Sequence, residues 1–167
     1  QVLIGTAVTA SGVIVAIFSP ILGAMADQTQ KRKPWIMFFS MFFLLATFSL
    51  WFAEPNMENT FWILLAYTIG FVSVDFSTVF NNSMMPSLVK PSNLGKLSGS
   101  GWGLGYLGGL VSLIIMLLLF VEQDNGLTLL GNNPMFGLDP EQREGTRIVG
   151  PLTAIWYIIF IVPFFIF

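Results

Sequence analysis

Two windows of the sequence carry no acidic or basic side chain over a length that few folds can accommodate. They run from residue 104 to 121 and from residue 148 to 167. A helix needs about 20 apolar residues to cross a hydrocarbon core roughly 30 Å thick. Hydrophobic types make up 54% of the chain and charged types 10%, whereas soluble domains are about 25% charged. The sequence therefore predicts an integral membrane protein.

Five apolar segments are long enough to span the bilayer. They cover residues 2–24, 35–53, 60–82, 98–121 and 148–167. Their apolar runs are continuous, without the alternation that a membrane β-barrel requires, so each segment is expected to be a helix. Only helices and closed barrels satisfy every backbone group in lipid. The expected fold is an all-α polytopic membrane protein with one transmembrane bundle, no separate soluble domain, and the lipid bilayer as a partner.

The charges in the loops predict an orientation. Basic residues concentrate in the loops over residues 25–34 and 83–97, while the loops over residues 53–60 and 122–147 are mainly acidic. Basic loops next to transmembrane segments face the cytoplasm. The first segment is therefore expected to run toward the cytoplasm. In the longest loop, Asp139 and Pro140 favour a helix start, with Asp139 as the N-cap; the alternative is an unstructured external loop.

Several chemistries are excluded by composition. The chain has no cysteine and no histidine, which removes thiol chemistry, disulfides and the commonest metal ligand. Seven basic residues and a net charge of −2 argue against nucleic acid as a partner. No metal or other cofactor is expected.

The first informative motif surrounds the end of the first segment. Gly23 precedes Asp27, and Lys31 and Arg32 follow. This spacing resembles the signature loop between helices two and three of the major facilitator superfamily. The resemblance implies that Gly23, Asp27, Lys31 and Arg32 form a loop that gates the cytoplasmic side. Two positions depart from the family pattern, because Gln28 stands where a basic residue is usual and position 30, usually Gly, is also Gln. A plain basic loop is the alternative, although it would need neither the Gly nor the Asp.

A second stretch resembles one family within that superfamily. Residues 80–86 have the sequence FNNSMMP, and residues 98–109 have the sequence SGSGWGLGYLGG. Both are similar to the Unknown Major Facilitator family, the relatives of the autophagy-related vacuolar amino-acid effluxers. The resemblance implies helices two to six of a twelve-helix transporter, with helix one and the C-terminal half outside these residues as partners. It implies amino acids as one possible solute, and a bacterial inner membrane, or a vacuolar membrane in a eukaryote.

Glycines recur at helical spacing in the fourth segment. Gly101, Gly105 and Gly109 lie four residues apart, which predicts a smooth face for close packing by another helix. The run over residues 103–108 also matches a dinucleotide-binding pattern. That pattern has meaning only after a strand, so it is rejected here.

Asp75 is the one acid well inside an apolar segment. Intramembrane charges usually face a cavity or a partner, so Asp75 is a candidate for carrying a coupled proton, for a cytoplasmic latch, or for a structural hydrogen bond. Asn81, one to two turns further on, is a candidate cavity residue or a helix-end residue.

These observations predict a secondary active transporter that moves a small solute by alternating access, and not an enzyme. A sugar:cation symporter of similar fold is one alternative. A membrane-embedded enzyme lacks the clustered acids that a divalent metal would need. A receptor or structural protein that moves no solute stays open.

Overall fold

The computed structural model describes residues 2–29, 31–56 and 58–166. Within them the chain forms helices and loops, with no strand. The long helices are α1 (Val2–Thr29), α2 (Arg32–Ser49), α3 (Thr60–Leu88), α4 (Leu94–Leu119) and α6 (Val149–Ile166). The short ones are the 3-10 helices η1 (Leu50–Phe52), η2 (Pro91–Asn93) and η3 (Met135–Gly137), together with α5 (Glu144–Arg147).

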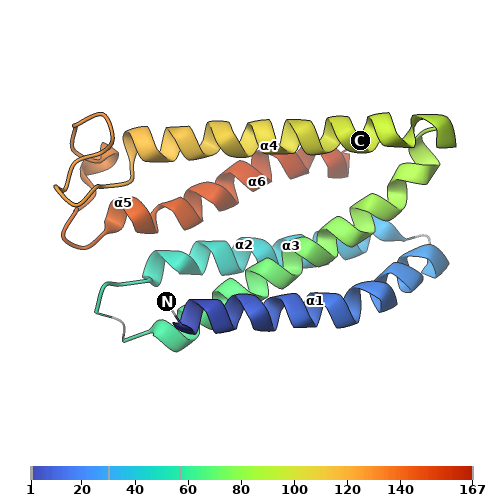
Figure 1. The fold of residues 1–167 in the computed structure, drawn as a ribbon, viewed down its shortest axis with the longest axis horizontal. Coiled ribbons are helices and arrows are strands. Elements are labelled where there is room, and N and C mark those ends of the chain that lie inside the picture. Colours follow the sequence, from blue (N-terminus) through green and yellow to red (C-terminus); the bar gives the residue numbers. More distant parts are fainter. Residues whose placement is uncertain (1, 30, 57, 167) are drawn as a thin grey trace.

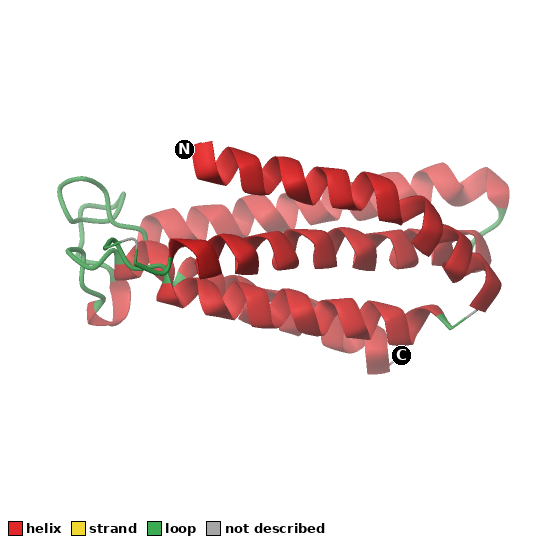
Figure 2. Ribbon diagram, turned by 90° about the horizontal axis from the view of Figure 1, so that it is seen from below, coloured by secondary structure: helices red, strands yellow, loops and turns green. Residues whose placement is uncertain are grey.

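Five helical stretches among the described residues are long and apolar enough to cross a membrane. They run alternately up and down, so that the loops gather at two opposite ends (Figures 1 and 2). The end where α1 stops and α2 starts holds Lys31, Arg32, Lys90 and Lys96 and is called the basic end. The opposite end, with residues 53–56, 58–59 and 120–143, is called the acidic end. The five-helix membrane fold is confirmed, and the alternation of loops agrees with the predicted topology.

Helices α1, α3 and α4 are longer than the apolar segments predicted for them. Helix α1 continues past residue 24, α3 continues past residue 82 through Pro86, and α4 starts before residue 98. The expected basic loops are therefore largely helical, because hydropathy marks where lipid ends whereas a helix continues into polar surroundings as long as its backbone bonds are made. The connection between α3 and α4 reduces to Val89, Lys90 and the turn η2.

The predicted helix start at Asp139 is wrong. Asp139 Oδ1 accepts a hydrogen bond from the Glu141 amide at 2.9 Å, which makes a local turn of the type that Asp favours. Arg143 then adopts a left-handed conformation (φ 54°, ψ 33°), which no residue of a right-handed helix can have, so that the helix begins at Glu144. The loop is nevertheless built of defined turns and is not a structureless connection.

The core lies between α1, α2, α3 and α6, near the basic end. Ala26, Ile36 and Phe80 are buried together. The Phe80 ring stacks on Trp35 with centroids 5.7 Å apart and on Phe39 with centroids 6.0 Å apart. Aromatic side chains contribute large contact areas in such a cluster. This packing holds the start of α2 against the end of α3.

Helix α4 is packed differently from the other long helices. It has one buried side chain, Met116, and most of its length lies apart from the trio of α1, α2 and α3 (Figure 1). An apolar helix that buries so little of itself in protein must meet lipid or other protein segments along its length.

Candidate functional site

The residues of the predicted gating loop lie together at the basic end. Arg32 Nη2 is 3.9 Å from Asp27 Oδ1, and Arg32 Nε donates to the Ala26 carbonyl oxygen at 3.3 Å. The Asp27 side chain is 76% exposed. Arg32 thus ties the start of α2 to the end of α1, while most of the Asp27 carboxylate faces outward, available to a further partner.

Within the described residues, Gly23 and Lys31 have no contact comparable to that between Asp27 and Arg32. Gly23 lies one turn before Asp27 on the same face of α1, and a Cβ built on it would meet nothing within 4 Å. Lys31 is exposed at the N-cap of α2 and makes no polar contact within the described residues. Within this part of the chain the Asp27 carboxylate contacts the Arg32 side chain and accepts no hydrogen bond from the N-terminus of α2. The gating role of all four residues stays a prediction.

The aromatic cluster supports this loop from inside the bundle. Trp35 belongs to the first turn of α2, directly after the loop, and stacks on Phe80 of α3. Lys33 lies over the ring of Phe164 in α6, 5.3 Å from its centroid. The loop is therefore fixed to both α3 and α6. Sequence reasoning missed this support, because an aromatic residue in an apolar helix gives no sign of which neighbour it stacks on.

A polar recess lies between α2, α3 and α6. Its volume is about 290 Å³, and we call it the polar recess after its four polar lining residues, Ser77, Thr78, Asn81 and Tyr157. The rest of the lining is apolar and comes from Ile36, Val74, Ile161 and Phe164. The Tyr157 hydroxyl is 2.8 Å from Ser40 Oγ, in hydrogen-bond contact. The recess places hydroxyl and amide groups, but no charged side chain, within the membrane-spanning part of the protein.

Asn81 and Asp75 are separated by the helix geometry. Asn81 lines the recess and Asp75 does not. Six residues along a helix of 3.6 residues per turn put the two side chains about 120° apart. Asp75 has no hydrogen-bond or ion-pair partner within the described part of the chain. The structure thus gives the two predicted residues separate surroundings, and their roles stay predictions.

A charged network at the acidic end was not foreseen from the sequence. The Glu122 side chain is 1% exposed and lies 2.9 Å from Arg143 Nε through Oε1. The same oxygen accepts a hydrogen bond of 2.6 Å from the Thr146 hydroxyl. A Cβ on Gly145 would overlap the Phe120 carbonyl oxygen and Glu122 Oε2. Glu122 therefore fastens the start of the long loop to its end and to α5, which directly precedes α6. Its one sequence signal is its place directly after an apolar window.

Arg147 joins the same end of the bundle to α2. Its Nε donates to the Trp51 carbonyl oxygen at 2.7 Å, and its guanidinium lies 5.0 Å from the centroid of the Trp51 ring. Glu54 is 4.0 Å from Nη2. Since the Arg147 side chain is only 9% exposed, the residue acts as a fixed support between η1 and α5, directly before α6.

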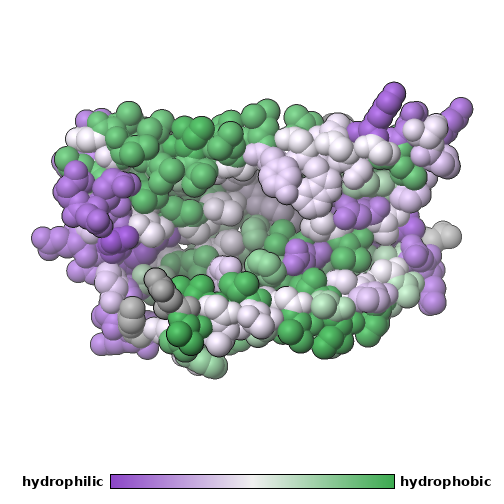
Figure 3. All heavy atoms as spheres, in the orientation of Figure 1, coloured by the Kyte–Doolittle hydropathy of each residue, from purple (hydrophilic) through white to green (hydrophobic). Residues whose placement is uncertain are grey.

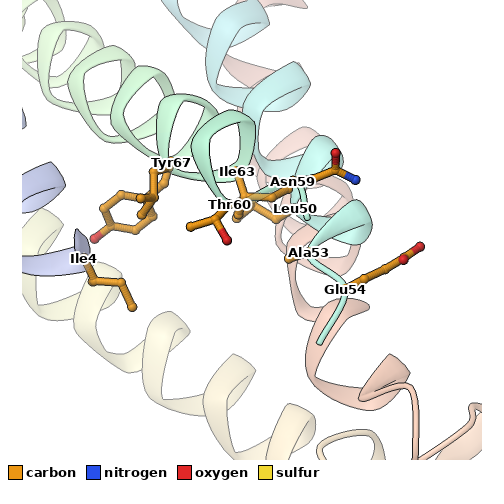
Figure 4. A pocket seen from close by; sticks show the side chains of 9 residues that line it. Ile4, Leu50, Ala53, Glu54, Asn59, Thr60, Ile63 and Tyr67 are labelled. Atoms are coloured by element: carbon orange, nitrogen blue, oxygen red, sulfur yellow. The ribbon is translucent and has the colours of Figure 1, made fainter. Parts of the chain in front are cut away.

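An apolar pocket of about 370 Å³ opens beside this end, between Ile4, the start of α3 and the end of α2. Figure 4 shows the Tyr67 hydroxyl directed toward Ile4, while the side chains of Glu54 and Asn59 extend away from Thr60 and Ile63. With its nearest charge directed away, the pocket offers apolar contact and little electrostatic recognition. It is a poor candidate site for a charged solute.

The glycine face of α4 has no partner within the described residues. A Cβ on Gly101, Gly105 or Gly109 would meet nothing within 4 Å. The close helix packing predicted for these glycines therefore requires a segment outside this part of the chain.

No group of three or more acidic side chains able to hold a metal ion occurs among the described residues.

The fold and the loop between α1 and α2 define a class of protein. They are typical of polytopic α-helical membrane proteins in which a short basic loop joins two helices through an Asp and an Arg. Comparison with known proteins gives the family. The family model described as MFS/sugar transport protein matches residues 1–167. The chain belongs to this family of the major facilitator superfamily and is a multi-pass membrane protein of transporter type.

One curated relative is similar to a large part of the chain. The "Uncharacterized MFS-type transporter YxiO" of Bacillus subtilis (strain 168) is 29% identical over 112 residues, which is 67% of this chain and 26% of that protein. The matched part of the chain thus spans about a quarter of the relative's length. No solved structure matches the chain.

Proposed function

We propose that the protein is a secondary active transporter that moves a small solute across the membrane by alternating access. The observation that carries this proposal is the match of a transporter family over residues 1–167, on a chain whose described residues include five helices long and apolar enough to span a membrane. Alternating access in such folds rocks one helix bundle against another around a site at their interface. Helix one, expected outside these residues, would complete this bundle, and the C-terminal half would supply the other side of that interface.

The loop at the basic end is proposed to gate the cytoplasmic side. Arg32 holds Asp27 at the end of α1, and the exposed part of the carboxylate is free to bind a donor on the opposite bundle in one state and release it in the other. An Asp carboxylate at an interface binds amide or guanidinium donors strongly, since charge-assisted hydrogen bonds are the stronger ones.

Asp27→Asn tests the gate. The substitution keeps the shape and removes the charge, so we expect normal insertion, greater labelling of cytoplasmic-side positions by a membrane-impermeant reagent, and slower transport. Asp124→Asn, an exposed acid at the opposite end, is the matched control. Unchanged transport together with unchanged labelling in Asp27→Asn would refute the gating role.

Two solute classes are supported by different observations. The resemblance of residues 80–109 to the amino-acid effluxers supports amino acids. The description of the matching family supports sugars, and so does the lining of the polar recess, since Ser77, Thr78, Asn81 and Tyr157 offer hydroxyl and amide groups without a charge. A neutral polyhydroxylated solute would need no buried counter-charge, whereas both charges of an amino acid would. Asp75 is the candidate carboxylate for a coupled ion.

The decisive experiment is transport by the full-length protein in vesicles with an imposed proton or sodium gradient. Pools of labelled sugars and amino acids are offered in turn. The proposed native location of the protein is the plasma membrane of a bacterium. Gradient-dependent uptake of one pool would establish the function and the solute class. Saturable binding of a solute without uptake under either gradient would favour the receptor alternative and overturn the transport proposal.

A further inference from the structure

The loop at the acidic end carries an apolar tip where turns are normally polar. Thr128 and Gly131 close a tight turn, with the Gly131 amide 2.8 Å from the Thr128 carbonyl oxygen and Gly131 at φ +76°. The two residues at the tip of this turn are Leu129 and Leu130. Turn tips favour Gly, Asn, Asp, Ser and Pro, so two leucines at the tip require an explanation other than turn formation.

Both leucines point away from the protein. Leu129 is 61% exposed and Leu130 is 55% exposed. Phe136, in the same loop, is 81% exposed and has a left-handed backbone (φ 64°), which is uncommon for a bulky residue. Its ring centroid lies 5.8 Å from that of Phe120, directly after the end of α4. We call Leu129, Leu130 and Phe136 the apolar tip.

The depth of the apolar tip is set by a backbone hydrogen bond. The Leu129 amide donates to the Leu117 carbonyl oxygen at 3.2 Å. Leu117 lies in the last turn of α4, inside a membrane-spanning stretch that ends at Leu119. The turn therefore folds back beside the final turn of α4 and satisfies one of its unpaired carbonyls. It does not extend away from the membrane.

The surface beside the tip is already apolar. Leu110, Leu113 and Ile114 on the same half of α4 are exposed and lie within the spanning stretch. Figure 3 shows apolar residues along the upper edge, over α4, continuing toward the loop end, where hydrophilic residues gather below them. The polar side of the loop is the Glu122 and Arg143 network, which fixes how the loop sits on α4 and α6.

We propose that the apolar tip inserts into the lipid bilayer, at the boundary between head groups and acyl chains on the membrane face opposite the basic end. The occupant of this surface is lipid, because the tip continues the exposed apolar side of α4, within a stretch long and apolar enough to span a membrane, at the depth of its last turn. Large apolar side chains at this level anchor a protein at the interface, and the Glu122 network holds the loop in the orientation that brings the tip to the membrane.

Spin labelling of the full-length protein in vesicles tests the proposal. A nitroxide is attached at Leu130→Cys or, as a second position, at Phe136→Cys, in a background free of other cysteines; residues 1–167 contain none. Collisions with oxygen, which partitions into lipid, are compared with collisions with a water-soluble nickel chelate. Leu110→Cys, on the exposed apolar side of α4 within its spanning stretch, is the reference at membrane depth. Asn125→Cys, on the polar turn of the same loop, is the water-facing control.

We expect labels on the tip to be accessible to oxygen and protected from the nickel chelate, as at Leu110→Cys and unlike Asn125→Cys. Collisions with the nickel chelate at the level of the control would place the tip in water and overturn the proposal. Protection from both reagents would show that protein covers the tip and would overturn it equally. Neither result depends on whether the protein transports a solute.

Discussion

Helices α4 and α6 both carry glycines, but Gly150 in α6 packs closely against another helix, whereas Gly105 in α4 touches no described residue. A Cβ on Gly150 in α6 would overlap the Thr47 carbonyl oxygen of α2 and lie 3.0 Å from the Leu50 Cβ, so the backbones of α2 and α6 meet at this point. Around Gly105 in α4 the space is open. The difference teaches that glycine spacing identifies a helix able to pack closely, while only the tertiary structure shows whether its partner lies in the same chain.

The largest effect is expected in the packed region, at its buried aromatic core. Phe80→Ala removes a fully buried ring that stacks on Trp35 and Phe39, and should lower the free energy of unfolding by about 3–5 kcal/mol. Thermal unfolding in detergent measures this change. Leu113→Ala, on the exposed face of α4, is the control, and an equal loss in both variants would contradict the assigned core.

Gly150→Ala tests the contact between α6 and α2 directly. The added methyl would overlap a backbone carbonyl, which cannot move as a flexible side chain can, so we expect a loss of about 1–3 kcal/mol in the free energy of unfolding. Gly108→Ala in α4 meets nothing within 4 Å and is the matched control. A Gly150→Ala protein as stable as Gly108→Ala would show that α6 does not approach α2 so closely.

Glu122→Gln probes the attachment of the long loop to α6. It removes the charge that faces Arg143 and weakens the acceptor for Thr146, with an expected loss of about 1–2 kcal/mol, because hydrogen bonds to charged groups contribute more than neutral ones. Protease cleavage of the loop should become faster. Glu141→Gln alters an exposed acid of the same loop, and equal cleavage rates in the two variants would contradict the role of Glu122.

Gly105→Leu should have the smallest effect on the stability of these residues and a large effect on function. Nothing within the described chain contacts this position, so the free energy of unfolding should change by no more than about 0.5 kcal/mol. If a segment outside this part of the chain packs on the glycine face, transport by the full-length protein should be lost. Normal transport by Gly105→Leu would refute the predicted packing.

The sequence was informative about the membrane and less so about helix ends. The apolar windows identified all five spans, because a spanning helix in lipid has little choice of residue types. They did not locate the end of α3, which continues to Leu88 through Pro86. The capping pattern of Asp139 and Pro140 misplaced the start of the last helical stretch, because the left-handed Arg143, after which the helix begins, leaves no signal in that pattern.

For the candidate sites, the motif pointed to Asp27 and Arg32, and the structure places their side chains 3.9 Å apart because both flank one short connection between two helices, while their gating role stays a prediction. The sequence placed Asp75 and Asn81 within two turns of each other, and only the structure shows that Asn81 lines the polar recess and Asp75 does not. Residues such as Ser40 and Tyr157 meet across more than a hundred positions of sequence, and no local pattern connects them.

The sequence alone determined which parts of this protein lie in lipid and which lie in water. The number of spans, the alternation of loops and the basic loop at one end follow from the free energy of placing apolar and charged groups in lipid or water. That free energy depends on residue type and on the length of a run, both of which can be taken from one chain. The tertiary structure alone decided which residues contact one another. Phe80 stacks on Trp35, and Glu122 binds Arg143. Gly150 lies against α2, while a Cβ on Gly105 would meet no described residue within 4 Å. These contacts are short-ranged and depend on how distant helices are placed against one another, which no residue determines locally.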